Sequence, residues 1–154
     1  MPSEFRIDKD RLLVVVVTTA GDRLLGEIFV QAYARHRHGP EQPVDVLNSA
    51  DPYFPLAVRG GGTVLLAKAH VREVEAVGEH PPDEQALAAR SARVELVLAG
   101  GLTRSGRVHV EAPADRSRLL DFLNRYEQPF LTIYTEDGLR LVNVSLIARV
   151  RQLD

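Results

Sequence analysis

Two short segments of the chain carry the same polar residues at the same spacing. The first reads Asp45-Val46-Leu47-Asn48 and the second reads Asp121-Phe122-Leu123-Asn124. A carboxylate accepts hydrogen bonds and an amide both donates and accepts them, so each pair suits a polar ligand or the edge of an RNA base. Shortly before the second segment, an arginine adds a fork of donors that matches phosphate or carboxylate groups. The candidate binding residues are therefore Asp45, Asn48, Arg118, Asp121 and Asn124.

The repeated Asp and Asn also have a structural interpretation. An Asn that ends a short helix tolerates the left-handed conformation, and an Asp near a helix accepts a hydrogen bond from a neighbouring backbone N–H. A folding constraint would recur in both segments, as these residues do. We therefore favour the structural interpretation and keep ligand or RNA binding as the alternative.

The sequence lacks the motifs of known catalytic sites. It contains no Gly-x-Ser-x-Gly, no phosphate-binding Gly-x-x-x-x-Gly-Lys, no dinucleotide fingerprint and no His-Glu-x-x-His. With no cysteine in the chain, thiolate metal sites, disulfides and cysteine nucleophiles are excluded. His36 and His38 have no third ligand at a suitable spacing, so we expect a surface loop there. We predict no catalytic residue, no metal and no cofactor.

The composition is that of an ordinary globular domain. The 154 residues are 45% hydrophobic and 26% charged, with 19 basic residues against 21 acidic ones. This balance is less basic than the footprint of most nucleic-acid binders. No apolar run approaches the roughly 18 residues of a membrane span, and the first residues lack the layout of a signal peptide. We expect a cytoplasmic protein with no membrane partner.

The chain contains an internal repeat. Val14–Val30 aligns without a gap on Val94–Val110, and Val44–Glu75 aligns on Leu120–Arg151. The identical pairs are Val14/Val94, Val17/Val97, Gly21/Gly101, Gly26/Gly106, Val30/Val110, Asp45/Asp121, Leu47/Leu123, Asn48/Asn124, Phe54/Phe130, Gly62/Gly138, Leu65/Leu141 and Val74/Val150. Such self-similarity predicts two copies of one structural unit.

The repeat sets the predicted domain boundaries. We place the first copy at 10–77, a linker with one or two helical turns at 78–91, and the second copy at 92–154. A unit of about 60 residues buries too little surface to be comfortably stable alone. We therefore expect the two copies to pack together or against further copies in an oligomer.

Each copy has the pattern of two strands, a short helix and three more strands. Leu12–Thr19 and Leu25–Val30 flank a glycine turn, which predicts a hairpin. Gly26 and Gly106 lie inside the second strand of each copy, where glycine marks a bulge, a bend or a close backbone approach. A short helix is expected within Ala114–Asn124, with a shorter counterpart at Val44–Asn48. The other strands are expected at Tyr53–Val58, Val64–Ala69, His70–Glu75, Phe130–Thr135, Arg140–Val144 and Leu146–Arg151.

This element order predicts a mostly β fold. We expect two tandem Sm-like or SH3-like small barrels, each with about five antiparallel strands and one short helix. Parallel βαβ folds are disfavoured, because no connection is long enough for a crossover helix.

The bent hairpin followed by Asp-x-Leu-Asn resembles Sm-like proteins. In those proteins an Asp and an Asn between the second and third strands line an RNA-binding pore, so the resemblance implies RNA contact by the four repeated residues. Here Asn48 and Asn124 follow the Asp by three positions instead of the usual four, and the basic, glycine-rich second signature of that family is missing.

The two copies are also similar to a group of small bacterial β-barrel domains without an assigned activity. The matching pattern in the second copy is Arg118-Leu119-Leu120-Asp121-Phe122-Leu123-Asn124 followed by Phe130. The first copy departs from it, because Glu41 takes the position of the Arg. This resemblance covers most of both copies and supports the fold without implying a function.

Three hypotheses for function follow. We favour a non-catalytic interaction or regulatory module that binds a protein partner, or itself, through exposed strand edges or through the pocket between the two copies. The second hypothesis is an Sm-like RNA binder in which two fused copies replace two subunits of a ring. The third is a sensor that holds a small ligand between the two barrels.

Overall fold

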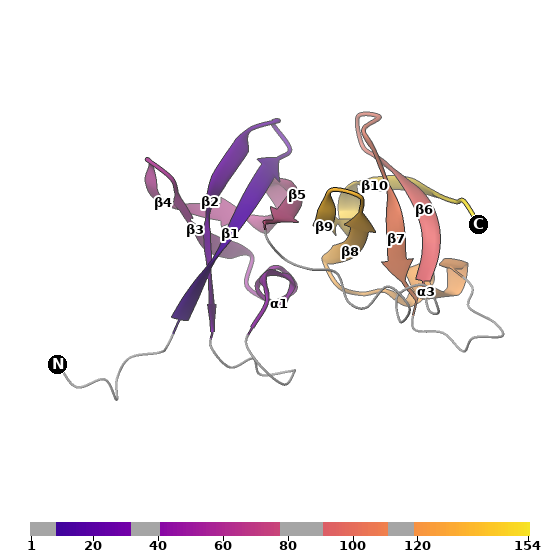
Figure 1. Ribbon diagram of the computed structural model, residues 1–154, viewed down its shortest axis with the longest axis horizontal. Coiled ribbons are helices and arrows are strands. Elements are labelled where there is room, and N and C mark those ends of the chain that lie inside the picture. The colour runs from indigo at the N-terminus through magenta and orange to yellow at the C-terminus, as the bar shows by residue number, and fades with distance from the viewer. Residues whose placement is uncertain (1–8, 32–40, 78–90, 111–118) are drawn as a thin grey trace.

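The fold is mostly β. The computed structural model describes residues 9–31, 41–77, 91–110 and 119–154, and its ten strands form one antiparallel sheet. The strand order is β10-β6-β7-β8-β9-β5-β1-β2-β3-β4. Figure 1 shows the first five strands in one lobe and the last five in the other, with β5 and β9 meeting between them.

The two halves contain matching sets of elements. The first half comprises β1 (Lys9–Thr18), β2 (Arg23–Gln31), α1 (Pro43–Leu47), β3 (Tyr53–Val58), β4 (Gly62–Ala67), a 3-10 turn (Lys68–His70) and β5 (Val71–Ala76). The second half comprises β6 (Ser91–Leu98), β7 (Thr103–His109), α3 (Leu119–Arg125), β8 (Phe130–Thr135), β9 (Gly138–Asn143), a 3-10 turn (Val144–Leu146) and β10 (Ile147–Gln152).

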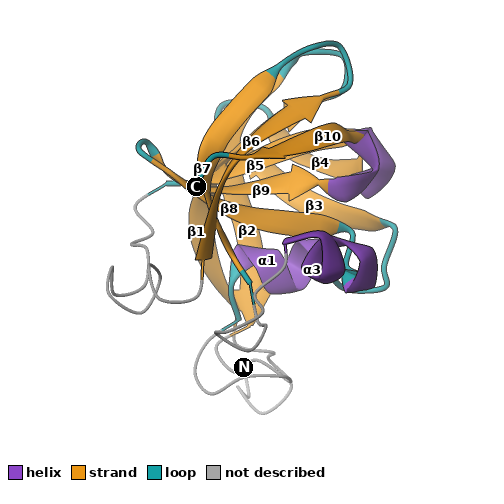
Figure 2. Ribbon diagram, turned by 90° about the vertical axis from the view of Figure 1, so that its right-hand side faces the viewer, coloured by secondary structure: helices purple, strands orange, loops and turns teal. Residues whose placement is uncertain are grey.

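The strand order and register repeat between the halves. The orders are β5-β1-β2-β3-β4 and β10-β6-β7-β8-β9. Val16 lies opposite Val74 in the first half, and Leu96 lies opposite Val150 in the second, with a bulge near the same end of both pairings. The strand order is linear, with β10 and β4 at its two ends, so the sheet is open. Figure 2 shows α1 and α3 on the same side of the strands. The predicted mostly β, antiparallel fold is confirmed, while the arrangement as two tandem barrels stays a prediction.

Alternation along the strands produces two hydrophobic cores. The core of the second half is made of residues from β6 to β9 together with Leu119 of α3 and Val110. The core of the first half is built around Val14, Val16 and Ile28, but it also contains Phe130 and Leu141 from β8 and β9. The second half therefore completes the core of the first, which fits the expectation that the two copies pack together.

The interior glycines mark a close approach between strands. A Cβ atom on Gly26 would overlap the carbonyl oxygen of Ala57, and one on Gly106 would overlap that of Tyr134. Of the predicted roles of these two glycines, the close backbone approach is confirmed. The contacts also make Ala57 the structural counterpart of Tyr134.

This counterpart corrects part of the sequence alignment. The pair Val58–Gly62 closes the β3–β4 turn around three residues, whereas Thr135–Gly138 closes the β8–β9 turn around two. The alignment of Phe54 with Phe130 is therefore wrong by one position. By its place in the hairpin, Phe130 corresponds to Tyr53.

The predicted strands Tyr53–Val58 and Phe130–Thr135 are confirmed at both ends. The other strands are present with ends shifted by a few residues. The predicted linker helix, the predicted start of the 114–124 helix, and His36 and His38 lie outside the described residues.

Candidate interaction site: the junction and the free edges

The junction between the halves is an antiparallel pairing of β5 with β9. Val74 lies opposite Leu141, flanked by the pairs Glu73–Val142 and Glu75–Arg140. Val74 and Leu141 are both fully buried. Backbone hydrogen bonds and an apolar pair thus join the second half to the first.

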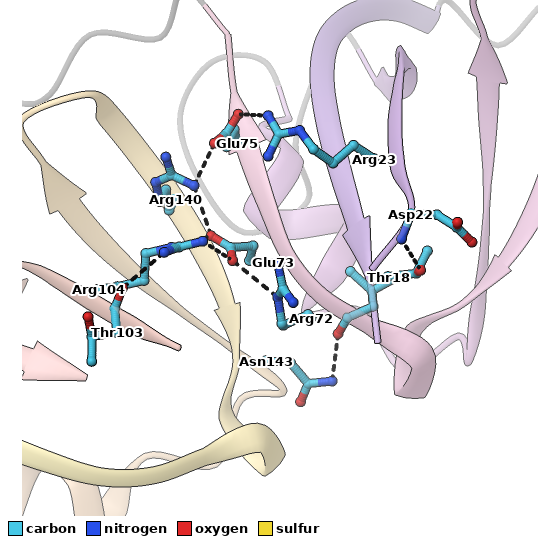
Figure 3. Close-up of polar contacts among 11 residues, drawn as sticks. Thr18, Asp22, Arg23, Arg72, Glu73, Glu75, Thr103, Arg104, Arg140 and Asn143 are labelled. Atoms are coloured by element: carbon cyan, nitrogen blue, oxygen red, sulfur yellow. Dashed lines mark hydrogen bonds and ion pairs between the residues drawn. The ribbon is translucent and has the colours of Figure 1, made fainter. Parts of the chain in front are cut away.

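A buried carboxylate lies at the centre of the junction (Figure 3). The side chain of Glu73 has 0% exposure. Arg104 donates from Nε to its Oε1 at 2.8 Å and from Nη2 to its Oε2 at 2.7 Å. Arg140 donates from Nη1 to Oε1 at 2.9 Å, and Arg72 lies at 3.4 Å from Oε2. Arg104 and Arg140 belong to the second half, so these charge-assisted bonds cross the junction.

The charges around Glu73 determine its protonation. Burial by itself would raise the pKa of Glu73, but hydrogen bonds and the positive charges of Arg104 and Arg140 outweigh this effect and lower the pKa. The carboxylate is therefore ionised at neutral pH. Loss of its arginine partners would leave an uncompensated charge in the interior.

Glu75 extends this network toward the surface. It accepts from Arg140 and, at 3.4 Å, from Arg23. The Arg23 side chain is largely exposed, so that outer pair contributes little to stability. The specific part of the junction is the buried pairing of Glu73 with the second half.

Asp45 and Asn48, two of the predicted binding residues, make structural contacts. Asp45 Oδ2 accepts from the Gln42 backbone N–H at 2.8 Å at the start of α1. Asn48 Oδ1 accepts from the Phe130 N–H at 2.8 Å, and the Tyr126 hydroxyl donates to the Phe130 carbonyl. Burial raises the pKa of the Tyr126 hydroxyl, against an opposing hydrogen bond with Asn48. Asn48 is thus a residue of the junction.

The backbone of the repeated Asn residues differs from the prediction. Asn48 ends α1, but with φ of −91°, so the expected left-handed conformation is wrong. Asn124 lies within α3, which ends one residue later. Without a positive φ at Asn48, its side-chain bond to Phe130 is the more direct reason for an amide at this position.

The Asp and Asn of the second Asp-x-Leu-Asn segment are exposed, whereas Phe122 and Leu123 pack against the core of the second half. Asp121 and Asn124 both lie on the surface of α3, and Arg118 lies outside the described residues. Figure 1 places α1 and α3 in different lobes, so the two segments do not form one site. Their predicted role in binding a ligand or RNA stays a prediction.

An open hollow of about 390 Å³ lies beside the junction. Lys68 and Ala69 line it from the first half, and residues 126–130 and 143–145 line it from the second. Lys68 Nζ donates to the Ser49 carbonyl at 3.1 Å and to Ser49 Oγ at 2.9 Å. Burial lowers the pKa of Lys68, while Asp51 opposes this shift.

The polar groups beside the hollow are already paired. Asn143 Nδ2 donates to the Val71 carbonyl at 2.9 Å, and its Oδ1 accepts from the backbone and hydroxyl of Ser145. Among the described residues, every buried side-chain nitrogen or oxygen has a hydrogen-bond partner. No group of three or more potential metal ligands occurs in those parts of the chain.

Within the described parts of the chain, the terminal strands β4 and β10 each pair with one neighbour only, and they are called the free edges of the sheet. Leu65 of β4 is 72% exposed, and Tyr53 on the adjacent β3 is 60% exposed. Their counterparts in the second half, Leu141 and Phe130, are 0% and 1% exposed because the first half covers them. The apolar positions that the junction buries on β8 and β9 are therefore also apolar on β3 and β4, where they are exposed.

Glu73 and its arginine partners belong to no sequence motif, so motif patterns did not predict them as site residues. A usable signal was present in the repeat itself. Glu73 aligns with Arg149, so a charge of opposite sign stands at the same strand position in the two copies.

Comparisons with family models, curated proteins and solved structures found no match. No helix in the described parts of the chain is long and apolar enough to cross a membrane.

Proposed function

We propose that this protein is a non-catalytic interaction module that binds another polypeptide strand at the free edges of its sheet. The observation that carries this proposal is the β5–β9 junction. There, one half of the chain already recognises the other by strand addition, which is a common mode of protein recognition.

The two halves, in this proposal, are copies of one small-barrel unit. The repeated strand order, register and interior glycines support it. Hydrogen bonds outside the ladders repeat too, because Thr19 N–H donates to the His70 carbonyl and Ala99 N–H donates to that of Leu146. Each unit then has two different edge strands, β5 and β4 in the first half and β10 and β9 in the second. The edges β5 and β9 pair within the chain, and the edges β4 and β10 remain available.

Fewer observations support the RNA-binding hypothesis and the small-ligand sensor hypothesis. Asp45 and Asn48, which the Sm-like resemblance assigns to RNA contact, already bind backbone groups of α1 and β8. Lys68 and Asn143, which line the hollow between the halves, already have partners. A bound RNA or small ligand would have to compete with these contacts.

The free edges offer unpaired backbone groups. Lys68 N–H donates to the Pro52 carbonyl, so the β4 residues of even number point toward β3 and Leu65 points its N–H and C=O outward. Leu153 N–H donates to the Arg93 carbonyl, so Val150 of β10 likewise points outward. Exposed edges of this kind pair readily with another strand.

Proline substitution at these two positions tests the proposal. Leu65→Pro and Val150→Pro each remove an outward N–H while leaving the ladder to the adjacent strand intact. We expect immobilised wild-type protein to retain a protein, either its own chain or another one, and each proline variant to lose part of that retention. Leu25→Lys, on an exposed site of β2, is the matched control and should retain as much as the wild type.

Three outcomes would contradict this proposal. One is unchanged retention in both proline variants. Another is co-purification with RNA, with binding that weakens steeply as salt rises. The last is a rise in melting temperature with a small molecule while no protein is retained.

A further inference from the structure

We propose that the occupant of the free edges is a second copy of this chain, with β10 of one copy paired antiparallel to β4 of the next. This inference rests on the proposed function and names its partner. It follows from transferring the contacts of the β5–β9 junction to the structurally equivalent residues at the two ends of the sheet.

The register of this pairing is determined by the repeat. Val74 corresponds to Val150 by its place opposite β1 or β6, and Leu141 corresponds to Leu65 by its place in the hairpin. Since Val74 lies opposite Leu141, Val150 lies opposite Leu65 of the next copy. Both residues point their backbone N–H and C=O outward, as this pairing needs.

The apolar surfaces match this register. Phe130 and Leu141 enter the core of the first half, and their counterparts Tyr53 and Leu65 are exposed. The docked copy would cover these two side chains with the end of its second half. The large exposed apolar side chains of β3 and β4 are thus the counterparts of the two side chains that the internal junction buries.

The helices supply a second set of equivalent contacts. Val44 of α1 packs against the core that contains Phe130, and its counterpart in α3 is Leu120, which is 68% exposed. Leu120 would therefore pack against Tyr53 of the next copy. An exposed leucine on α3 has a structural reason in this assembly.

Asn124 has a defined role in this assembly. Asn48 accepts from the N–H of Phe130, so Asn124 would accept from the N–H of Tyr53 in the next copy. The hydrogen-bonded pair Pro52–Lys68 means that Tyr53 points its N–H away from β4. The repeated Asn is then a junction residue in both copies, within the chain at position 48 and between chains at position 124.

The contact is head to tail, because different surfaces of the two copies meet. Such heterologous contacts form a closed ring when the rotation between units closes, and otherwise an open filament. The intermolecular junction lacks the buried ion pair, because Arg149 replaces Glu73 while Leu24 and Val64 replace Arg104 and Arg140. Arg149 has no acidic partner at these positions, which weakens this contact relative to the internal one. We therefore expect assembly that depends on protein concentration.

The first experiment is sedimentation velocity over a range from about 1 µM to about 1 mM. We expect the mass to rise above the 17.1 kDa of one chain. Leu65→Lys should raise the concentration needed for assembly by about tenfold or more, since it places a charge in an apolar contact. Leu25→Lys should assemble as the wild type does. Both sites are exposed in the single chain, so folding is preserved.

The second experiment tests the register by disulfide formation. The chain has no cysteine, so Leu65→Cys and Val150→Cys chains each carry one thiol. Directly paired strand residues fall within the Cα separation that a disulfide accepts. We expect the mixed disulfide when the two variants are combined, and little when Leu25→Cys replaces Leu65→Cys.

The contribution of Asn124 is tested by rescue. Asn124→Ala should weaken assembly, whereas Asn124→Asp keeps the acceptor oxygen and should restore most of it. Equal assembly by wild-type protein and Asn124→Ala would overturn the assigned contact.

The outcomes separate this inference from the proposed function. A mass of 17.1 kDa throughout, with another protein captured in an edge-dependent way, would overturn the self-assembly and leave the interaction module standing. A disulfide between two Leu65→Cys chains alone would show a two-fold β4–β4 pairing and overturn the head-to-tail register. Monomeric protein with no edge-dependent capture would overturn both.

Discussion

The internal junction and the free edges use the same backbone geometry with different charges. At the junction, Glu73 is buried between Arg104 and Arg140. At the corresponding edge positions stand Arg149, Leu24 and Val64. Backbone pairing and apolar contact are shared by both surfaces, whereas the buried ion pairs occur at one of them only.

This difference shows that affinity and partner specificity come from different interactions at these surfaces. Apolar burial and strand pairing favour any suitable edge, while a buried charge is tolerated only beside its own partners. Glu73 therefore selects β9 as the neighbour of β5 and disfavours a β4 edge there, because β4 carries no arginine. The buried charge of Glu73 therefore favours pairing of β5 with β9 over pairing of β5 with β4.

Removal of the buried carboxylate should have the largest effect. Glu73→Ala leaves Arg104 and Arg72 without their anion and leaves Arg140 with Glu75 alone. We expect a loss of about 3–5 kcal/mol in the free energy of unfolding. Chemical denaturation measures it. Glu95→Ala is the control, because Glu95 pairs with an exposed arginine, and it should cost at most about 1 kcal/mol. Similar losses in the two variants would contradict a special contribution of the buried Glu73 ion pairs to the internal junction.

The next effect compares equivalent leucines. Leu141→Ala empties a fully buried site and should cost about 2–5 kcal/mol. Leu65→Ala alters an exposed site in the single chain and should change stability by about 0.5 kcal/mol or less at low protein concentration. Thermal unfolding of both variants checks this. A large loss in Leu65→Ala would mean that β4 is already covered within one chain.

A smaller difference is expected between the repeated asparagines. Asn48→Ala leaves the buried Phe130 N–H without its acceptor, which costs about 1–3 kcal/mol. Asn124→Ala should leave the unfolding of the single chain almost unchanged, because Asn124 is exposed on α3. Equal destabilisation would show that the two residues have the same role within one chain.

The smallest effect is on the acid dependence of stability. Because the pKa of Glu73 is lower in the folded protein than the value of about 4.3 in the unfolded chain, its stabilisation is fully present above that value. It is lost as the pH falls through the folded pKa. Glu73→Gln should flatten the decline in stability below about pH 4.3, measured by denaturation at several pH values. An unchanged decline would mean that other carboxylates control it.

Part of the fold was predictable because it depends on local patterns. Two segments that follow turn residues, Tyr53–Val58 and Phe130–Thr135, form strands with the predicted ends. The glycine at position 26, inside a strand pattern, indicated the close approach to β3. The sequence alignment predicted two matching units, but it placed Phe130 opposite Phe54 instead of Tyr53. The β3–β4 turn has one residue more than the β8–β9 turn, and an ungapped match between two phenylalanines conceals this difference.

The candidate site was less predictable. The repeated Asp and Asn drew attention to position 48, yet its partner is the backbone N–H of Phe130, and every residue except proline has such a group. The residues that distinguish the junction, Glu73 and Arg104, lie far apart in the chain and match no motif. Their pairing requires β5 and β7 to be brought together by strands that are not adjacent in sequence.

The sequence by itself determined the strands, the close backbone approach at the interior glycines and the similarity of the two halves, since side-chain alternation and glycine act over a few neighbouring residues. Only the tertiary structure decided that β5 pairs with β9, that Glu73 is the buried charge between them, and that Leu65 stays exposed while Leu141 does not. The physical reason is that strand edges present the same backbone groups everywhere. The choice between edges depends on side chains that meet only after folding.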